Sequence, residues 1–168
     1  NQIIEALMIK FLILIFLFLT NLGFSNIIYI GTTGSDQSGE GSLDNPFLTI
    51  QHGINESTTG DTVLILEGNY FENINVQVLQ GDEFSLTITS EFILEGDSSK
   101  ISSTIISGIE SGRIFRSDPM FALTIEGLTF QGGYSEFQNE DGLLIIDPQH
   151  FILKISIIRN CHVNWGDG

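Results

Sequence analysis

The sequence is poor in basic residues and has almost no cysteine. Its 168 residues include 6 lysines and arginines against 21 aspartates and glutamates, which gives a formal net charge of −15. Because an acidic surface repels the phosphate backbone, this balance argues against nucleic acid as a partner. The single cysteine, Cys161, excludes a disulfide framework within these residues. A disordered acidic tail is also excluded, since 42% of the residues are hydrophobic and only 16% are charged.

Long hydrophobic runs are lacking as well, with one short exception near the start. Residues 11–19 are all apolar and follow Lys10. As a helix they would rise about 13 Å, which is too short for a bilayer core of about 30 Å. Gly23 and Ser25 supply the small side chains of a cleavage site before residue 26. This pattern predicts a signal peptide over residues 8–25, with an uncleaved anchor as the alternative.

The predicted cleavage divides the chain into three parts. Residues 1–7 precede the first methionine and are interpreted as upstream sequence, residues 8–25 as the signal peptide, and residues 26–168 as the exported domain. Removal of the first 25 residues takes away one acid and one base, so the exported part keeps its net charge of −15. The prediction is a secreted or cell-surface domain with no stable transmembrane span after cleavage.

The exported part alternates short apolar runs with turns rich in Gly, Asn, Asp and Ser. The runs favour strands, because Ile, Val, Phe and Thr dominate them, and they recur about every ten residues. They lie at residues 27–30, 63–66, 74–78, 84–88, 92–94, 101–106, 113–115, 121–125, 128–130, 143–146 and 153–163. Gly127 would let the chain bend between two of them. This pattern predicts an all-β fold.

One helix is predicted among these strands. Asn45 can cap its start, Pro46 suits the first helical position, and Phe47, Ile50 and Ile54 recur with helical spacing. The resulting apolar stripe would pack against the edge of a sheet.

Two segments of the chain also repeat each other. Leu123 and Ile125 match Ile155 and Ile157 at an offset of 32 residues, and the following segments match at 33. A period of this size is compatible with stacked coils of a β-solenoid.

Two motifs carry a resemblance to a known family. The first is YIGTTGSD at residues 29–36, followed by NPFLTI at 45–50 and GDTVLILEGNYFENI at 60–74. It resembles the N-terminal start of right-handed parallel β-helix proteins of the pectin-lyase-like superfamily. The second is LTIEGLTFQGG at residues 123–133, which is similar to the coils of surface proteins related to polymorphic outer-membrane proteins.

The resemblance implies one all-β domain, a right-handed parallel β-helix with a short N-terminal capping α-helix. It also implies that further β-helix coils follow, because no cap matches the turn at residues 165–168. The superfamily contains polysaccharide lyases, hydrolases and epimerases beside surface proteins, so the fold alone does not decide the function.

Catalytic residues are difficult to assign. A polysaccharide lyase must neutralise a uronate carboxylate and abstract the neighbouring proton with a base. The bases left after cleavage are Lys100, Arg113, Arg116, Lys154 and Arg159. We interpret Arg113 and Arg116 as turn residues, and Lys154 and Arg159 as residues of an outer face. No aspartate pair stands in a recognisable hydrolase motif, and no two histidines have the spacing of metal ligands.

A cation site and a modification site are the remaining candidates. The loop over residues 34–44 carries Asp36, Glu40 and Asp44, and calcium takes oxygen ligands from flexible acidic loops. These three residues are the predicted calcium ligands, while a loop without metal is the alternative. Asn55 opens an Asn-Glu-Ser sequon for N-glycosylation, which has meaning only in a eukaryotic source.

Two functions follow from this sequence. The leading interpretation is a secreted or cell-surface β-helix protein for adhesion or glycan binding, with an extracellular polysaccharide or surface glycan as partner and no catalysis in these residues. The alternative is a secreted polysaccharide lyase or epimerase that acts on uronate-containing glycans through an active site in later coils. The sequence shows no group of basic residues suited to a lyase, which favours the non-catalytic interpretation.

Overall fold

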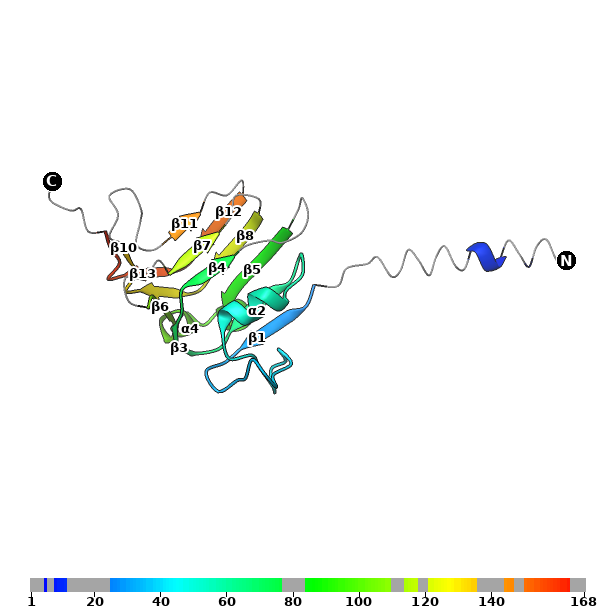
Figure 1. Cartoon of the computed structure of the whole chain (residues 1–168), viewed down its shortest axis with the longest axis horizontal. Coiled ribbons are helices and arrows are strands. Elements are labelled where there is room, and N and C mark those ends of the chain that lie inside the picture. Colours follow the sequence, from blue (N-terminus) through cyan, green and yellow to red (C-terminus); the bar gives the residue numbers. More distant parts are fainter. Residues whose placement is uncertain are drawn as a thin grey trace.

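The computed structural model describes residues 5, 8–11, 25–76, 84–109, 114–117, 121–135, 144–146 and 150–163. Within these ranges the chain forms layers of strands with short helices beside them (Figure 1). Every strand pair is parallel. Strands β1 and β12 lie at opposite ends of the stack (Figure 1).

The first sheet supplies one wall of the core. It holds, in spatial order, β1 (Ile27–Ile30), β2 (Thr62–Ile65), β5 (Phe84–Ser90), β8 (Phe121–Glu126) and β12 (His150–Lys154). Its register is continuous, since Val63 lies opposite Ile88 and Ile88 lies opposite Ile125. All three side chains are fully buried. Alternate residues of each strand therefore face the core, as the period of a strand requires.

The remaining strands form three smaller sheets. The second sheet holds β3 (Gly68–Phe71), β6 (Thr104–Ser107), β9 (Thr129–Gln131) and β13 (Ile157–Arg159); the third holds β4 (Ile74–Val76), β7 (Phe115–Ser117) and β11 (Leu144–Ile146); β10 (Tyr134–Ser135) pairs with β14 (His162–Val163). Consecutive strands fall in different sheets, because β2, β3 and β4 belong to the first, second and third sheets and β5, β6 and β7 follow the same order.

Helix α2 (Ile50–Glu56) packs against β1, β2 and β4 through its buried residues Ile50, Gly53 and Ile54. It begins four residues later than predicted from Pro46. Phe47 instead continues an extended path, forms a bridge to Ile30 and donates its N–H to the carbonyl of residue 29. The helix starts after Thr49, whose side chain accepts the N–H of residue 52.

The prediction of an all-β solenoid is wrong, because the chain contains more helix than its sequence indicated. Residues 92–94 were predicted as a strand but lie in α3 (Phe92–Glu95), and the first part of the run 101–106 lies in α4 (Ser99–Ser103). Gly96 adopts a left-handed φ of 69° and donates to the carbonyl of Phe92, which closes a helical turn. The described residues thus form a mixed α and β structure with parallel strands in separate sheets, none of which closes on itself.

The predicted 32-residue repeat also pairs the wrong residues of β8 and β12. Leu123 lies opposite Phe151, and Ile125 lies opposite Leu153. Ile155 lies in the turn between β12 and β13 with a positive φ of 39°. Apolar residues continue to alternate with polar ones through this turn. The sequence pattern therefore did not reveal where β12 ends.

The bend at Gly127 is confirmed. Gly127 has a φ of 69° between β8 and β9, a conformation that suits a residue without a Cβ. Leu128 and Phe130 follow it and are both buried. The change of parity at Gly127 therefore keeps the apolar residues of both strands in one core.

No helix in the described part of the chain is long and apolar enough to cross a membrane. Most of the predicted signal peptide lies outside the described residues. Its bounds at residues 8–25, and the start of the exported part at residue 26, stay predictions.

Candidate functional site

A line of threonines crosses the first sheet on the face opposite the core. Thr62 lies opposite Thr87, and Thr87 lies opposite Thr124. Each of these side chains is half-buried, and neighbouring strands of a sheet are about 4.8 Å apart. The threonines therefore form a ladder with the spacing of the strands, and β-branched side chains suit the strand conformation.

Two further hydroxyls lie beside this ladder. Ser85 stands two residues before Thr87 on the same face of β5. Its N–H donates to Thr59 Oγ1 at 3.1 Å, and the two hydroxyl oxygens are 3.5 Å apart. We call the set Thr59, Thr62, Ser85, Thr87 and Thr124 the hydroxyl face.

Asp61, which precedes Thr62 of the hydroxyl face in the sequence, has a buried side chain. Asp61 is only 3% exposed. Its carboxylate accepts the N–H of Asn26 at 2.8 Å and both the N–H and the hydroxyl of Thr58 at 2.7 and 2.9 Å. These donors satisfy the buried charge. The hydroxyl face thus presents neutral groups on a chain with a net charge of −15.

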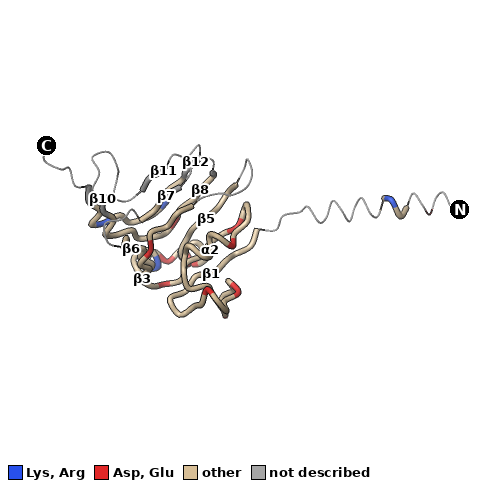
Figure 2. Tube along the Cα trace, viewed as in Figure 1, with Lys and Arg blue, Asp and Glu red and all other residues tan. Residues whose placement is uncertain are grey.

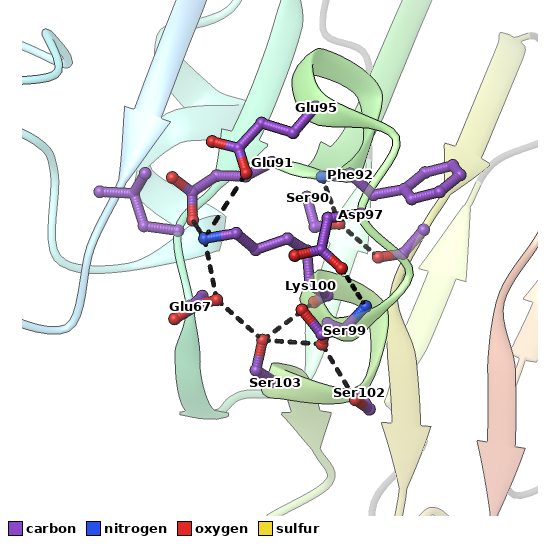
Figure 3. A network of polar contacts seen from close by, with 12 residues as sticks. Glu67, Ser90, Glu91, Phe92, Glu95, Asp97, Ser99, Lys100, Ser102 and Ser103 are labelled. Atoms are coloured by element: carbon purple, nitrogen blue, oxygen red, sulfur yellow. Dashed lines mark hydrogen bonds and ion pairs between the residues drawn. The ribbon is translucent and has the colours of Figure 1, made fainter.

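A second polar cluster surrounds Lys100 of α4 (Figure 3). Its Nζ lies 2.9 Å from a carboxylate oxygen of Glu67, 3.5 Å from one of Glu91 and 4.0 Å from one of Glu95. Glu67 lies between β2 and β3, Glu91 precedes α3, and Glu95 ends it. The lysine therefore joins three segments of the chain. We call these four residues the Lys100 cluster.

Hydroxyl groups hold the helices around this lysine. Ser103 donates to Glu67 at 3.2 Å. Thr129 donates to the carbonyl of Ile101 at 2.7 Å from a fully buried position, which ties α4 to β9. These bonds fix α4 on the second sheet. Lys100 is therefore positioned by the attachment of its helix as well as by its three glutamate partners.

The electrostatics of the Lys100 cluster keep the lysine charged. The hydrogen bond to Glu67 and the nearby charge of Glu91 raise the pKa of Lys100. The same hydrogen bond from Lys100, with a further one from Ser103, lowers the pKa of Glu67. A protonated lysine has no lone pair to take a proton. At neutral pH the charged lysine therefore holds these segments together, and Lys100 itself does not accept a proton.

The predicted calcium ligands lie in one loop, where the carboxylate of Asp36 already accepts hydrogen bonds from the chain itself. Asp36 uses its carboxylate for the N–H groups of Leu48 and Thr49, at 2.8 and 3.0 Å, and for the hydroxyl of Thr49 at 2.7 Å. The described residues contain no group of three or more acid, histidine or cysteine side chains that could hold a metal. Calcium at Asp36, Glu40 and Asp44 stays a prediction, which a calcium-dependent rise in Tm would confirm and an unchanged Tm would exclude.

The predicted glycosylation site lies on the surface of α2. The Asn55 side chain is exposed, and its Oδ1 accepts a hydrogen bond from Gln51 at 3.0 Å. Ser57, the third residue of the sequon, donates its hydroxyl to the carbonyl of Ile54 at 2.7 Å. Glycosylation of Asn55 stays a prediction for a eukaryotic source.

The other predicted bases are dispersed. Lys154 lies 3.8 Å from Glu126, and Arg159 donates from Nε to Gln131 at 2.9 Å. Arg113 lies outside the described residues, and the structure describes Arg116 only as part of β7. Lys100, Lys154 and Arg159 therefore each contact a different partner.

Sequence reasoning missed both clusters. The hydroxyl face had one local signal, the Thr87-Ile88-Thr89 alternation that places two threonines on the same side of a strand. Lys100 had a weaker signal, since its closest partner Glu67 is 33 residues away in the sequence. The residues that make up each cluster could not be inferred without knowing which strands pair and in which register.

Comparison with known proteins gives a similarity in sequence but none in family model or solved structure. No family model matches the chain, and no solved structure matches it. The chain is similar to the uncharacterized protein YwoF of Bacillus subtilis (strain 168), with 28% identity over 150 residues. The match covers 87% of this chain and 31% of YwoF, so the chain spans about a third of the length of that protein.

Proposed function

We propose that the exported part of this chain is a non-catalytic glycan-binding protein that acts in adhesion at or outside the cell surface. The hydroxyl face is the observation that carries the proposal. Hydroxyl groups both donate and accept hydrogen bonds, as the hydroxyls of sugars do. A ladder with a spacing of about 4.8 Å offers one contact after another to a polymer of repeating units.

The net charge of the chain indicates which glycans are suitable ligands. A protein with a net charge of −15 repels polymers of uronate, because both carry carboxylates. The hydroxyl face itself adds no charge to the contact. We therefore propose neutral glycans as ligands rather than uronate-containing ones.

The state of the bases supports binding rather than catalysis. A lyase needs an uncharged base beside the substrate and a cation for its carboxylate. Lys100 is held among three glutamates, and Lys154 lies beside Glu126. Both lysines are thus held in ion pairs.

Isothermal titration with a panel of oligosaccharides tests the proposal. The panel contains neutral oligomers of glucose, mannose and N-acetylglucosamine, with oligogalacturonate as the acidic comparison. We expect at least one neutral oligomer to bind and oligogalacturonate not to bind. The double variant Thr87→Val and Thr124→Val removes two hydroxyls at nearly constant shape, and should weaken binding about tenfold or more, at about 1 kcal/mol per hydrogen bond.

Thr33→Val is the matched control, because Thr33 is exposed in the loop after β1. It should leave the affinity unchanged. Equal affinity of the double variant and the unaltered protein would refute the role of the hydroxyl face. Release of unsaturated uronate products from pectate or alginate, followed by ultraviolet absorbance, would refute the absence of catalysis.

Export is the remaining part of the proposal and rests on the apolar run at residues 11–19. Sequencing of the N-terminus of protein recovered from the culture medium tests it. We expect the mature chain to start at Asn26. Retention of the whole chain inside the cells would contradict export.

A further inference from the structure

The backbone nitrogen of Asn26 lies against a buried carboxylate. It donates its N–H to Asp61 Oδ1 at 2.8 Å, and Asp61 is only 3% exposed. The carbonyl of Asn26 in turn accepts the N–H of Thr62 at 2.9 Å. Residue 26 is therefore fixed through both its nitrogen and its carbonyl, one position before β1 begins.

The other hydrogen-bond donors to the Asp61 carboxylate carry no charge. They are the N–H and the hydroxyl of Thr58, at 2.7 and 2.9 Å. Among the residues that the structure describes, no lysine or arginine forms an ion pair with Asp61. Hydrogen bonds satisfy the oxygens of a buried carboxylate, but an opposite charge nearby stabilises it further.

The distribution of charge agrees with this. Acidic residues appear around β1 and α2 (Figure 2). The described basic residues of the exported part lie on other elements, namely α4, β7, β12 and β13. A positive charge at the nitrogen of Asn26 would therefore stand beside an acid that has no other cationic partner among the described residues.

Signal-peptide cleavage would create that positive charge. The signal peptide is predicted to end at Ser25, so the new amine depends on the export part of the proposed function. Hydrolysis of the bond between Ser25 and Asn26 by a signal peptidase consumes one water. The new carboxyl group leaves with the signal peptide and loses its proton, and the amine on Asn26 takes up a proton. The resulting ammonium group has three N–H donors, whereas the peptide nitrogen had one.

A second hydrogen-bond acceptor loses its donor in the same step. The hydroxyl of Ser25 donates to the carbonyl of Gly60 at 2.6 Å, and Ser25 departs with the signal peptide. Gly60 directly precedes Asp61 and donates its own N–H to the carbonyl of Ser85 at 2.8 Å, which ties this turn to β5. Cleavage thus removes one donor from the carbonyl of Gly60 and adds two donors at the nitrogen of Asn26.

We propose that the α-ammonium group of Asn26, formed when the signal peptide is removed, binds the buried carboxylate of Asp61 and fastens the start of β1 to β2. Charge-assisted hydrogen bonds are about twice as strong as neutral ones. The uncleaved precursor has only a neutral N–H at this point. Processing therefore stabilises the fold after export, and the precursor lacks this ion pair while it crosses the membrane. The ion pair does not depend on glycan binding.

Acetylation of the α-amine tests the ion pair. Protein recovered from the culture medium is first sequenced to establish that it starts at Asn26. It is then treated at pH 7 with the N-hydroxysuccinimide ester of acetic acid, and mass spectrometry follows each amine. Only an unprotonated amine attacks the ester, and the ion pair keeps this amine protonated. The α-amine should react at least about tenfold more slowly in the folded protein than in guanidinium chloride. Lys154, whose side chain is 51% exposed, should react at similar rates in both.

An alanine inserted between Ser25 and Asn26 separates the charge from the site. The mature chain then begins one residue earlier, so the ammonium group lies about 3.8 Å further along the chain. Asn26 keeps the neutral N–H that bonds to Asp61 in the structure, and every hydrogen bond of Asp61 is retained. The α-amine of this form should react as fast as in the unfolded chain, and Tm should fall by about 2 °C or more.

Asp61→Asn removes the charge of the acceptor. It should release the α-amine of Asn26 to acetylation as the insertion does. Asp97→Asn is the matched control, because Asp97 is exposed and accepts the N–H of Ser99, and should leave the rate at Asn26 unchanged. Circular dichroism shows whether each variant folds, and the insertion decides the question if Asp61→Asn does not.

The possible results distinguish the ion pair from export. A mature chain that starts at Asn26, with an α-amine that reacts equally fast when folded and unfolded, would overturn the ion pair and leave export intact. Equal rates and equal Tm values for the inserted form and the unaltered protein would also overturn the ion pair alone. A mature chain that starts at another residue would contradict the predicted cleavage position and the ion pair together.

Discussion

Asp36 and Glu72 share the N-terminal end of helix α2. The N–H groups of residues 48 and 49 donate to Asp36 at 2.8 and 3.0 Å, and those of residues 50 and 51 donate to Glu72 at 2.9 and 3.0 Å. The first N–H groups of a helix have no partner within the helix. Two carboxylates from distant segments therefore take the place of those partners and join three parts of the chain.

The pKa values of the two carboxyl groups shift in opposite directions from their ordinary values. Burial raises the pKa of Glu72, and the N–H groups of Ile50 and Gln51 offset this only in part. Burial also acts to raise the pKa of Asp36, but the hydrogen bonds from Thr49 and the N–H of residue 48 outweigh it and lower the pKa. The cause of the difference is the balance between desolvation and donated hydrogen bonds.

We predict that the pH dependence of stability separates Glu72 from Asp36. A raised pKa means that the folded state binds the Glu72 proton more tightly than the unfolded chain does, so stability falls as the pH rises through that pKa. For Asp36, stability is present above its ordinary pKa of 3.8 and is lost as the pH falls towards its lowered pKa. Melting curves from about pH 3 to pH 8 measure both effects.

Single variants assign each part of that pH profile. Glu72→Gln should remove the gain in Tm on acidification from neutral pH towards the ordinary glutamate range. Asp36→Asn should reduce the loss of Tm at the acid end. Curves for both variants that run parallel to the unaltered protein at every pH would contradict the assignment.

Gly127 provides a test of the corner between β8 and β9. Its φ is 69°, and an added Cβ would lie 3.0 Å from Ser90 Oγ and 3.1 Å from two carbons of Phe92. Gly127→Ala should therefore cost the left-handed strain of about 1–2 kcal/mol and a further 1 kcal/mol or more from the close contacts. Urea unfolding measures the loss.

Gly132→Ala is the matched control for this corner. Gly132 has nearly the same φ of 71°, but an added Cβ there meets nothing within 4 Å. Its variant should show the strain alone, about 1–2 kcal/mol. Equal losses at both glycines would show that the contact with α3 does not constrain Gly127.

Thr129 and Thr104 are both fully buried but differ in their hydrogen bonds. The hydroxyl of Thr129 donates to the carbonyl of Ile101 at 2.7 Å, whereas that of Thr104 has no partner among the described residues. Thr129→Val should destabilise the fold by about 1–3 kcal/mol, because the carbonyl is left unsatisfied. Thr104→Val should be neutral or stabilising, since it removes an unpaired polar atom. Similar losses in urea unfolding would refute this distinction.

The Lys100 cluster should contribute more to stability than an exposed ion pair. Lys100→Met leaves Glu67, Glu91 and Glu95 close together without a cation, and should lower Tm. Lys154→Met is the control, because Lys154 is 51% exposed and pairs with one acid at 3.8 Å, and should change stability by less than about 0.5 kcal/mol. High salt should reduce the loss in Lys100→Met. No loss, or one as small as that of the control, would contradict the role of the cluster.

Much of the strand pattern could be predicted from the sequence. The first strand has the predicted bounds of residues 27–30, and the bend at Gly127 falls where the parity of apolar residues changes. Periodic apolar residues carry this information because each strand buries alternate side chains. Local patterns of this kind need no knowledge of the partner strand.

Short helices and distant contacts could not be predicted in the same way. Helix α3 has four residues and no buried side chain, so it leaves no apolar stripe to detect. The hydroxyl face depends on which threonines stand opposite one another, and the sequence repeat already assigned the wrong partners to Leu123 and Ile125. The hydrogen bonds of Asp36 with residues 48 and 49 follow from a loop geometry that the sequence does not encode locally.

The affinity of Thr87→Val and Thr124→Val for a neutral oligosaccharide tests the account most directly. The double variant keeps the volume and β-branching of both side chains and removes only the two hydroxyls. Titration of the unaltered protein, the double variant and Thr33→Val against the best-binding neutral oligomer should show a loss of about tenfold or more in the double variant alone. Unchanged affinity in the double variant, or binding of oligogalacturonate alone, would contradict the proposed function.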